Sequence, residues 1–203
     1  MRSVRREEEL SLVLTGTIAE EGVRRILAEY RDELAKRFSP YFLRKVERTL
    51  PVHEPDLRTP EEKAAEIRRI IEETEPTAMC RTVGDGGIFT ALWELCREEN
   101  CGMRARIADI PIRQEVIEVC RFMSCDPYYM VSGEDVVLIA CRRGLCLVDL
   151  LRKVGIEAAL IGYLTEKPEK LLRQGDQDRY LNRPKEDEWI KLKNNQERRE
   201  TQS

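Results

Sequence analysis

Two adjacent glycines, Gly86 and Gly87, stand directly before the clearest helical pattern in the chain. Apolar side chains then recur at intervals of three and four residues from Ile88 to Cys96, which is the spacing of one face of an α-helix. Glycine tolerates backbone conformations that other residues avoid, so the pair predicts a tight turn that opens a helix. A strand-to-helix turn of this kind is typical of domains in which helices pack on a sheet.

Other apolar segments alternate between strand and helix patterns on both sides of this turn. Short runs predict strands at 10–15, 77–80, 103–107, 136–141 and 156–164. Helical spacing predicts helices from 20, from 59 to about 73, over 112–123 and over 147–154. We also expect 128–131 to pair with 136–141 as a hairpin across Ser132-Gly133. The predicted fold class is α+β, a mixed β-sheet with helices packed against it and a helical lead-in.

The start of one helix can be predicted to the residue. Thr59 can accept a hydrogen bond from the first turn, Pro60 suits the first helical position, and Glu62 completes a capping box. The preceding segment 51–58 contains two prolines and mixed charges, so we expect it to be a connector.

The chain divides into three parts by composition. Residues 1–9 form a charged extension, and residues 10–166 form the domain, with a helical segment at 20–73 and a core at 77–165. Residues 167–203 are polar and charged with few apolar anchors, so we expect a mobile tail with one short helix.

The overall charge excludes several kinds of partner. The formal net charge is −3, and basic and acidic residues are interspersed, so no dominant positive field favours nucleic acid. The longest strongly apolar run, Val136 to Cys141, is too short to span a bilayer. No secretory signal pattern follows the charged start. We therefore expect a cytoplasmic protein without nucleic-acid or membrane partners.

The cysteines and the histidine limit the chemistry. The seven cysteines include three pairs with four intervening residues, at 96/101, 120/125 and 141/146. Zinc sites prefer shorter steps, and Cys96 and Cys120 lie on predicted apolar faces, so we expect reduced thiols in the core and no metal site. A metal or redox role is the alternative. His53 is the single histidine, lies in the connector and is expected at the surface.

Several segments together resemble a known protein family. They are Gly86-Gly87-Ile88-Phe89-Thr90-Ala91-Leu92-Trp93-Glu94-Leu95, Ile110-Pro111-Ile112-Arg113-Gln114-Glu115, Cys125-Asp126-Pro127-Tyr128 and Ala158-Ala159-Leu160-Ile161-Gly162-Tyr163-Leu164-Thr165. In this order they are similar to the carboxy-terminal domain of proteins related to aminoimidazole ribonucleotide synthetase (AIR synthase). The segments Leu14-Thr15-Gly16, Glu21-Gly22 and Lys36-Arg37-Phe38-Ser39-Pro40 resemble the hydrogenase-maturation branch. The resemblance covers about residues 10 to 165.

The resemblance implies how such a domain works. In this superfamily an amino-terminal domain supplies most of the ATP site and the metal-binding carboxylates, and the carboxy-terminal domain closes a glycine turn over the phosphates. Only residues 1–9 precede the shared region here, so the resemblance implies that the ATP-binding domain is absent. No catalytic residue can be assigned, and ATP and Mg²⁺ are expected only if a partner supplies that domain.

The glycine turn is the candidate phosphate- or ligand-binding site, formed by Gly84, Asp85, Gly86 and Gly87. Free N–H groups at the start of a helix favour an anion. The family turn usually reads Asp-x-Thr-x-Gly-Gly, but Thr82 replaces its aspartate, and Asp85 would repel a phosphate unless a metal or Arg81 offset its charge. The alternative is a tight turn whose second glycine permits close packing.

Two functions follow from the resemblance. The first is a stand-alone, non-catalytic or partner-dependent binding module. The second is one half of a split ATP-dependent enzyme, completed by a separately encoded ATP-binding domain. The surface that faces this domain in relatives should carry uncovered apolar groups, which such a partner or homo-oligomerisation would bury.

Overall fold

A computed structural model describes residues 9–50 and 58–200 of the chain, and its architecture is a mixed seven-stranded sheet with helices packed against it. The predicted α+β class is confirmed. The strands are β1 (Ser11–Thr15), β2 (Met79–Thr82), β3 (Gly102–Arg106), β4 (Val137–Cys141), β5 (Ala158–Thr165), β6 (Lys170–Gln174) and β7 (Gln177–Tyr180). The helices are α1 (Glu20–Glu29), α2 (Arg31–Ala35), α3 (Pro40–Thr49), α4 (Pro60–Thr74), α5 (Gly87–Glu98), α6 (Gln114–Phe122), α7 (Gly144–Lys153) and α8 (Glu188–Glu200). Short 3-10 turns η1 (Ile107–Asp109) and η2 (Pro127–Tyr129) complete the set.

The strands follow the order β2-β4-β1-β5-β3-β6-β7 across the sheet. β6 runs parallel to β3, whereas the other neighbouring strands are antiparallel. The β1 strand therefore lies inside the sheet, between β4 and β5, although it comes first in the chain. β2, which leads into the glycine turn, lies at one edge of the sheet.

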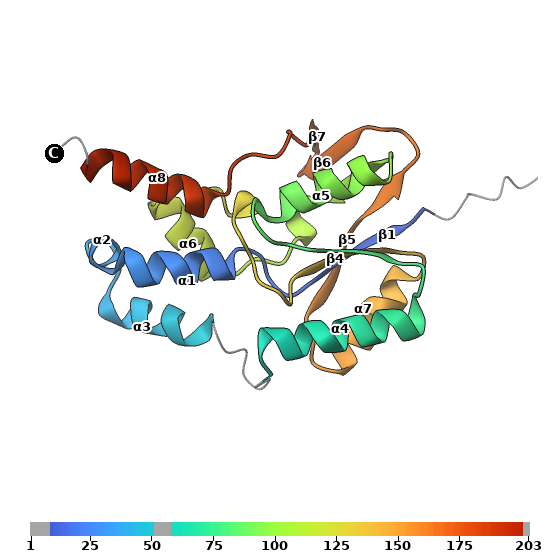
Figure 1. Ribbon diagram of the computed structural model, residues 1–203, viewed down its shortest axis with the longest axis horizontal. Coiled ribbons are helices and arrows are strands. Elements are labelled where there is room, and N and C mark those ends of the chain that lie inside the picture. The colour runs from blue at the N-terminus through green and yellow to red at the C-terminus, as the bar shows by residue number, and fades with distance from the viewer. Residues whose placement is uncertain (1–8, 51–57, 201–203) are drawn as a thin grey trace, which may run out of the picture.

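Helices cover both faces of the sheet (Figure 1). Because successive side chains of a strand point to opposite faces, Leu12 and Leu14 pack in one apolar cluster with α5, while Val13 packs in another with α4 and α7. All three side chains are fully buried. This alternation fixes the register of β1 and holds α5 on one face of the sheet.

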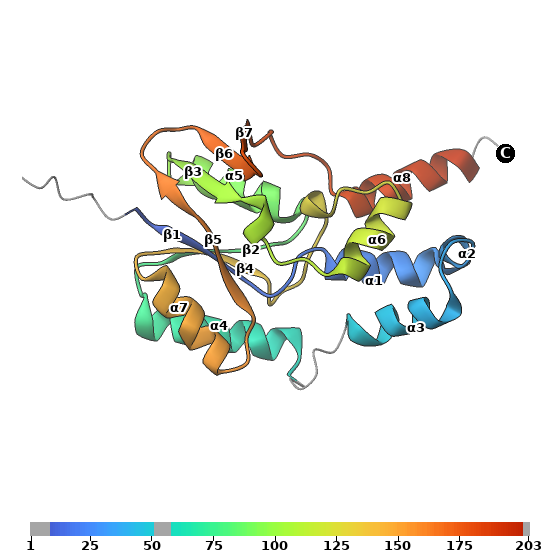
Figure 2. The same ribbon diagram turned by 180° about the vertical axis from the view of Figure 1, so that it is seen from behind.

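A third apolar cluster lies beyond one end of the sheet, between α1, α2, α3, α6 and α8 (Figure 2). Val23 and Ile26 of α1 meet Val116 and Val119 of α6 there, and Trp189 of α8 closes the cluster. We refer to these five helices as the helical lobe. No helix in the described part of the chain is long and apolar enough to cross a membrane.

The predicted capping box is confirmed at the start of α4. The Glu62 N–H donates to Thr59 Oγ1 at 3.2 Å, and the Thr59 N–H donates to Glu62 Oε2 at 2.7 Å. Ser39 caps α3 in a similar way, ahead of Pro40. The connector predicted before α4, including His53, lies mostly outside the described residues.

The predicted hairpin between 128–131 and 136–141 is wrong. Asp126 accepts a hydrogen bond from the Tyr128 N–H, and Pro127 occupies the first position of a 3-10 turn, so this segment curls instead of extending. Both edges of β4 are also taken, by β1 and by β2. The short apolar run had the composition of a strand, but no free edge was left for it.

The expected boundary at residue 166 is also wrong in structural terms. β6 pairs with β3 and β7 pairs with β6, so the segment after 166 extends the sheet by two strands. Leu172 is buried in the same cluster as α5. A few apolar residues of this polar segment were sufficient to anchor it, because Leu172, Leu181 and Trp189 are buried.

Candidate functional site

The glycine turn connects the edge strand β2 to α5, as the sequence predicted. The Gly87 N–H donates to the Gly84 carbonyl at 3.0 Å, which closes the turn. Gly86 and Gly87 both have positive φ, at 79° and 65°, in the left-handed region that side chains with a Cβ avoid. The backbone of this turn therefore requires both glycines.

Gly87 has a second reason to be glycine. A Cβ at this position would lie 2.6 Å from both the Met130 nitrogen and the Tyr128 oxygen. The start of α5 thus rests directly on the backbone of the segment that follows η2. This close contact is the packing role that we considered as the alternative to anion binding.

A carboxylate from the far end of the chain lies on the turn. The Gly86 N–H donates to Asp187 Oδ2 at 2.8 Å, across 101 residues of sequence. The other carboxylate oxygen, Oδ1, accepts from the Trp189 N–H at 2.8 Å. An N–H group at the start of a helix favours a negative charge, and here Asp187 provides that charge.

The Asp187 carboxylate is held without a cation. Only 3 % of the residue is exposed, and it has no ion pair within the described ranges 9–50 and 58–200. Burial raises the pKa of Asp187 above its usual value, while hydrogen bonds from the backbone of Gly86, Trp189 and Val131 act in the opposite direction. The nearby Asp85 carboxylate raises this pKa further. Backbone donors therefore offset only part of the cost of burying this group.

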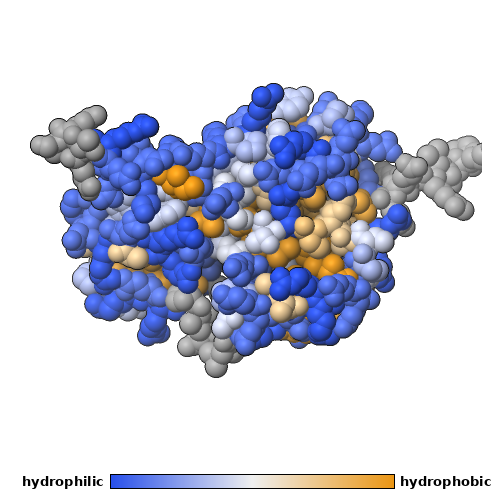
Figure 3. All heavy atoms as spheres, viewed as in Figure 1, coloured by the Kyte–Doolittle hydropathy of each residue, from blue (hydrophilic) through white to orange (hydrophobic). Residues whose placement is uncertain are grey.

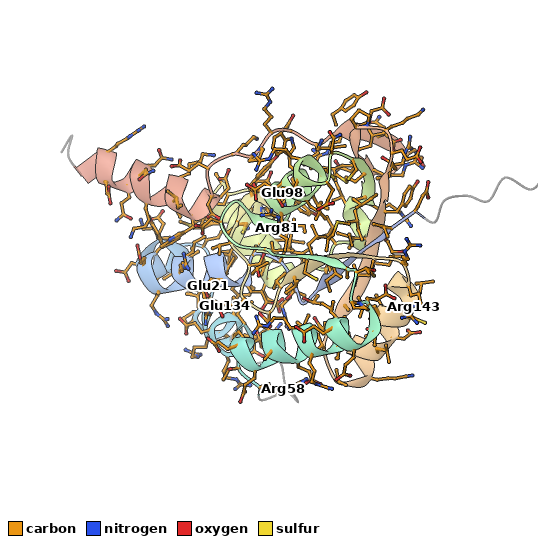
Figure 4. All side chains as sticks on the ribbon, turned by 45° about the vertical axis from the view of Figure 1, so that its right-hand side comes forward. Glu21, Arg58, Arg81, Glu98, Glu134 and Arg143 are labelled. Carbon is orange, nitrogen blue, oxygen red and sulfur yellow. The ribbon has the colours of Figure 1, made fainter. Side chains whose placement is uncertain are left out.

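Arg81 does not neutralise Asp85 in the way that the sequence allowed. Its guanidinium forms salt bridges with Glu94, at 2.8 Å, and with Glu98, both on α5 (Figure 4). These contacts tie the edge strand to the helix. Thr82, which replaces the family aspartate, and Asp85 are both exposed.

Aromatic rings and two cations surround the start of α5. The Phe89 and Tyr128 rings stack with centroids 4.8 Å apart, and Tyr129 meets Phe89 edge-on at 5.3 Å. Arg179 lies over the Phe89 ring at 5.8 Å, and Lys185 lies over the Tyr129 ring at 4.9 Å. The segment that carries Asp187 is therefore fastened to the same surface by cation–π contacts.

A charged pocket of about 320 Å³ opens beside Gly84. It lies between the starts of α1 and α4 and the loop 131–135. Its lining includes four basic side chains, Arg24, Arg25, Arg58 and Lys63, and five acidic ones, Glu20, Glu21, Glu61, Glu134 and Asp135. Figure 4 shows Glu21 and Glu134 on the side of the molecule where α1 approaches α4, with Arg58 nearer the start of α4. The pocket offers both signs of charge next to the turn.

An apolar hollow of about 310 Å³ lies along the edge strand β2. Its apolar lining includes Ile67 and Ile71 of α4, together with Ala78, Cys80 and Val137. Four charged residues also line it, namely Arg68, Glu72, Arg81 and Glu134. In Figure 3 the apolar surface of this face gathers in the same region, between α5 and α4. The outer edge of β2 has no neighbouring strand within the described sheet.

The cysteines are all free thiols. Cys96, Cys120 and Cys141 are buried, and burial raises the pKa of Cys96 to about 12 and that of Cys141 to about 11. No group of three potential metal ligands occurs among the residues that the structure describes. Buried cysteines of this kind pack as small apolar side chains.

The sequence analysis missed Asp187 as part of the site. Asp187 lies in a segment that we expected to be a mobile tail. The signal was present in the neighbouring Trp189, because a tryptophan in a polar segment indicates an anchor; it is 6 % exposed and meets the Tyr30 ring at 6.3 Å. Sequence alone could not reveal which backbone group the adjacent carboxylate would reach.

The fold and the turn together define a class of protein. It is an α+β domain with a mixed sheet, in which a double-glycine turn starts a buried helix. Residues 7–173 match the family described as AIR synthase related protein, C-terminal domain. The chain belongs to this family, which confirms the resemblance.

Curated relatives include hydrogenase maturation proteins. The chain is 34% identical over 80 residues to carbamoyl dehydratase HypE of Azotobacter vinelandii, which is 38% of this chain and 24% of that protein. It is 32% identical over 94 residues to the hydrogenase expression/formation protein HupE of Azotobacter chroococcum, 44% of this chain and 28% of that protein. The matched regions thus span about a quarter of the length of these relatives.

Solved structures show the same fold. Escherichia coli HypE superposes with a TM-score of 0.67 at 19% identity, over 93% of this chain and 54% of that one. HypE in a HypE–HypF complex gives a TM-score of 0.66 at 18% identity, over 88% of this chain and 54% of that one. The chain therefore corresponds to about half of a HypE chain, and one structural relative is known in a complex with another protein.

Proposed function

We propose that this chain is a stand-alone AIR synthase-related C-terminal domain that acts as a non-catalytic or partner-dependent binding module. The observation that carries the proposal is the hydrogen bond from the Gly86 N–H to Asp187. A carboxylate on this N–H group competes with any phosphate for the same donor and adds charge repulsion. In this conformation the glycine turn is closed to the phosphates of ATP.

Partner dependence is supported by the apolar hollow along β2. An edge strand with unpaired backbone groups and an adjoining apolar surface is a favourable place for another chain to bind. A separately encoded ATP-binding domain or a second copy of this chain would cover the partly exposed Ala78, Cys80 and Val137. The HypE–HypF complex supports the idea that proteins with this fold work with partners.

The free thiols are consistent with the cytoplasmic location that we propose.

The second candidate is one half of a split ATP-dependent enzyme, related in fold to HypE. The charged pocket beside Gly84 favours it, since Arg24, Arg58 and Lys63 are placed where they could meet a charged ligand. Several acidic side chains share this pocket, so a Mg²⁺-bound phosphate fits it better than a bare phosphate. A partner would have to supply the remaining metal ligands and most of the nucleotide site.

Binding of Mg–ATP separates the two candidates. A ligand that binds the native state raises the melting temperature. For the binding module we expect 5 mM Mg–ATP to shift the melting temperature of the full chain by less than about 1 °C. A clear increase with Mg–ATP, absent with Mg²⁺ alone, would contradict the proposal and favour the split enzyme.

Oligomeric state tests the partner surface. Ala78 lines the hollow, and Ala78→Asp places a charge in it without changing the sheet edge. If a second copy covers the hollow, light scattering should show a dimer for the parent chain and a monomer for this variant. Exposed Tyr41→Asp, on α3, is the matched control and should leave the mass unchanged. A parent monomer would leave the separately encoded domain as the partner that we propose.

A further inference from the structure

The turn that ends α5 brings two cysteines together. The Cys101 N–H donates to the Cys96 carbonyl at 3.0 Å, and the Asn100 N–H donates to the Arg97 carbonyl at 3.3 Å. Asn100 has a φ of 50°, in the left-handed region. These bonds define the turn that ends many helices, and it folds its last residue back onto the final helical turn. In a continuous helix, side chains five positions apart would diverge by about 140°.

The backbone separation of this pair suits a disulfide. With standard bond lengths, the hydrogen bond from the Cys101 N–H to the Cys96 carbonyl limits the distance between the two Cα atoms to about 7 Å at most. Disulfides usually span about 4.4–6.8 Å between Cα atoms. Cys96 is 1 % exposed, and the partly buried Cys101 packs against the same apolar cluster.

The two thiols also interact with each other. Burial, then the charge of Cys101 and a hydrogen bond between the two side chains, raise the pKa of Cys96 to about 12. Burial raises the pKa of Cys101 as well, whereas the hydrogen bond with Cys96 lowers it. The nearby Lys170 ammonium favours the thiolate form of both residues. Cys101 is therefore the more accessible and more reactive of the two thiols.

A second cysteine pair has the same turn but a different thiol arrangement. At the end of α6 the Cys125 N–H donates to the Cys120 carbonyl at 2.9 Å. The Cys120 thiol, however, contacts Met130 Sδ at 4.0 Å, and the Cys125 thiol donates to the Met123 carbonyl at 3.6 Å. These two thiols are directed at different acceptors, so the spacing and the turn alone do not pair them.

We propose that Cys96 and Cys101 form a redox-sensitive dithiol, which closes to a disulfide in the native fold when it meets a low-molecular-weight disulfide such as oxidised glutathione. The Cys101 thiolate attacks one sulfur of the oxidant, and the small thiol that leaves takes up the proton from Cys101. Cys96 then attacks the Cys101 sulfur of the mixed disulfide, and the second small thiol leaves with the proton from Cys96. Two protein thiols are oxidised to one disulfide, and the oxidant is reduced to two thiols.

The disulfide would lock the end of α5 to the start of β3. Cys101 directly precedes Gly102, where an added Cβ would lie 1.9 Å from the Lys167 oxygen, so this junction is tightly packed. A bond between groups that are already in place restricts the unfolded chain more than the native one, so it stabilises the fold. This inference goes beyond the proposed function and does not depend on it.

The test treats the folded full chain with oxidised glutathione at pH 8 and maps the products by mass spectrometry. Trypsin cleaves after Arg97, which lies between the two cysteines, so a disulfide joins two separate peptides. We expect the link between Cys96 and Cys101 to form before any other link and to be reversed by dithiothreitol. Cys141 and Cys146 have the same spacing, but Gly144 begins α7 between them, so the exposed Cys146 should remain a glutathione adduct.

Two variants separate the two steps of the reaction. Cys96→Ala should stop at a glutathione adduct on Cys101, and Cys101→Ser should leave the buried Cys96 unmodified. The melting temperature is compared in a Cys80→Ser/Cys146→Ser background, which removes the exposed thiols. There the oxidised chain should melt at least about 2 °C above the reduced chain.

Several results would overturn the inference. One is a glutathione adduct on Cys146 without a link between Cys96 and Cys101 in the folded chain, and another is a link that forms only in urea. Equally fast closure of Cys120 with Cys125 would mean that the contact between the thiols does not govern the reaction, which also contradicts it. A melting temperature below that of the reduced chain would show that the native fold does not accommodate the bond.

Discussion

Gly87 lies so close to Met130 that a Cβ on the glycine would come within 2.6 Å of the Met130 nitrogen. Because backbone atoms cannot move aside as a flexible side chain can, this contact fixes the start of α5 against the segment after η2. The same residue has a φ of 65°. Conformation and space therefore both exclude a larger residue at this position.

The exchange Gly87→Ala should consequently destabilise the protein strongly. The left-handed conformation costs an alanine about 1–2 kcal/mol, and overpacking against backbone adds about 1–3 kcal/mol. Gly175→Ala is the control, since Gly175 has a φ of 60° but no atom within 4 Å of an added Cβ. In urea denaturation, Gly175→Ala should lose only the about 1–2 kcal/mol that the left-handed conformation costs, without the additional loss from overpacking. Equal losses for the two variants would mean that the contact with Met130 has no energetic role.

The capping box at α4 gives a second prediction. Thr59→Ala removes the acceptor for the Glu62 N–H and should lower the free energy of unfolding by about 1 kcal/mol. Thr49→Ala is the control, because Thr49 lies at the end of α3 and its hydroxyl bonds only carbonyl groups of its own helix. Thermal or urea unfolding should leave that variant within about 0.5 kcal/mol of the parent. A loss at Thr49 as large as that at Thr59 would contradict the cap.

The sequence was informative where a local pattern decides the structure. The box at Thr59, the glycine pair and the periodicity of α5 are local, and each was predicted correctly. The family resemblance rested on the order of several such segments and was confirmed by the match over residues 7–173.

Long-range pairing could not be predicted in the same way. Tyr128–Val131 had the composition of a strand, yet β1 and β2 already take both edges of β4. The hydrogen bond between Asp187 and the Gly86 N–H depends on how β6, β7 and α8 are placed, and no sequence periodicity predicts that placement. The charge and position of Asp187 in the sequence indicated only a solvated tail.

The C-terminal anchor leads to a third prediction. Trp189→Ala removes a buried ring that contacts Tyr30 and should release α8 from the helical lobe. We expect limited trypsin digestion to cleave the variant after Lys185 much faster than the parent. Ile190→Ala is the control, because Ile190 is 38 % exposed and its loss should have little effect. Equal rates of tryptic cleavage in the two variants would show that Trp189 does not anchor the segment.

The buried thiols predict how stability depends on pH. Burial raises the pKa of Cys96 to about 12 and those of Cys125 and Cys141 to about 11, compared with about 8.5 for an unperturbed cysteine. A raised native pKa means that the unfolded chain loses its thiol protons first. The contribution of these thiols to the free energy of unfolding is therefore complete below about pH 8.5. It is lost as the pH rises towards 11 and 12.

Alkylation of the native protein tests this directly. At pH 8 iodoacetamide should modify the exposed Cys146 first, while buried Cys96, Cys120 and Cys141 should react only after unfolding, because their thiols are both covered and protonated. Mass spectrometry of peptides identifies the modified positions. The variant Cys141→Ala should show a shallower loss of unfolding free energy between about pH 9 and 10.5 than the parent, whereas Cys146→Ala should match the parent. Rapid modification of Cys141 in folded protein, or identical slopes for all three proteins, would show that burial does not control these thiols.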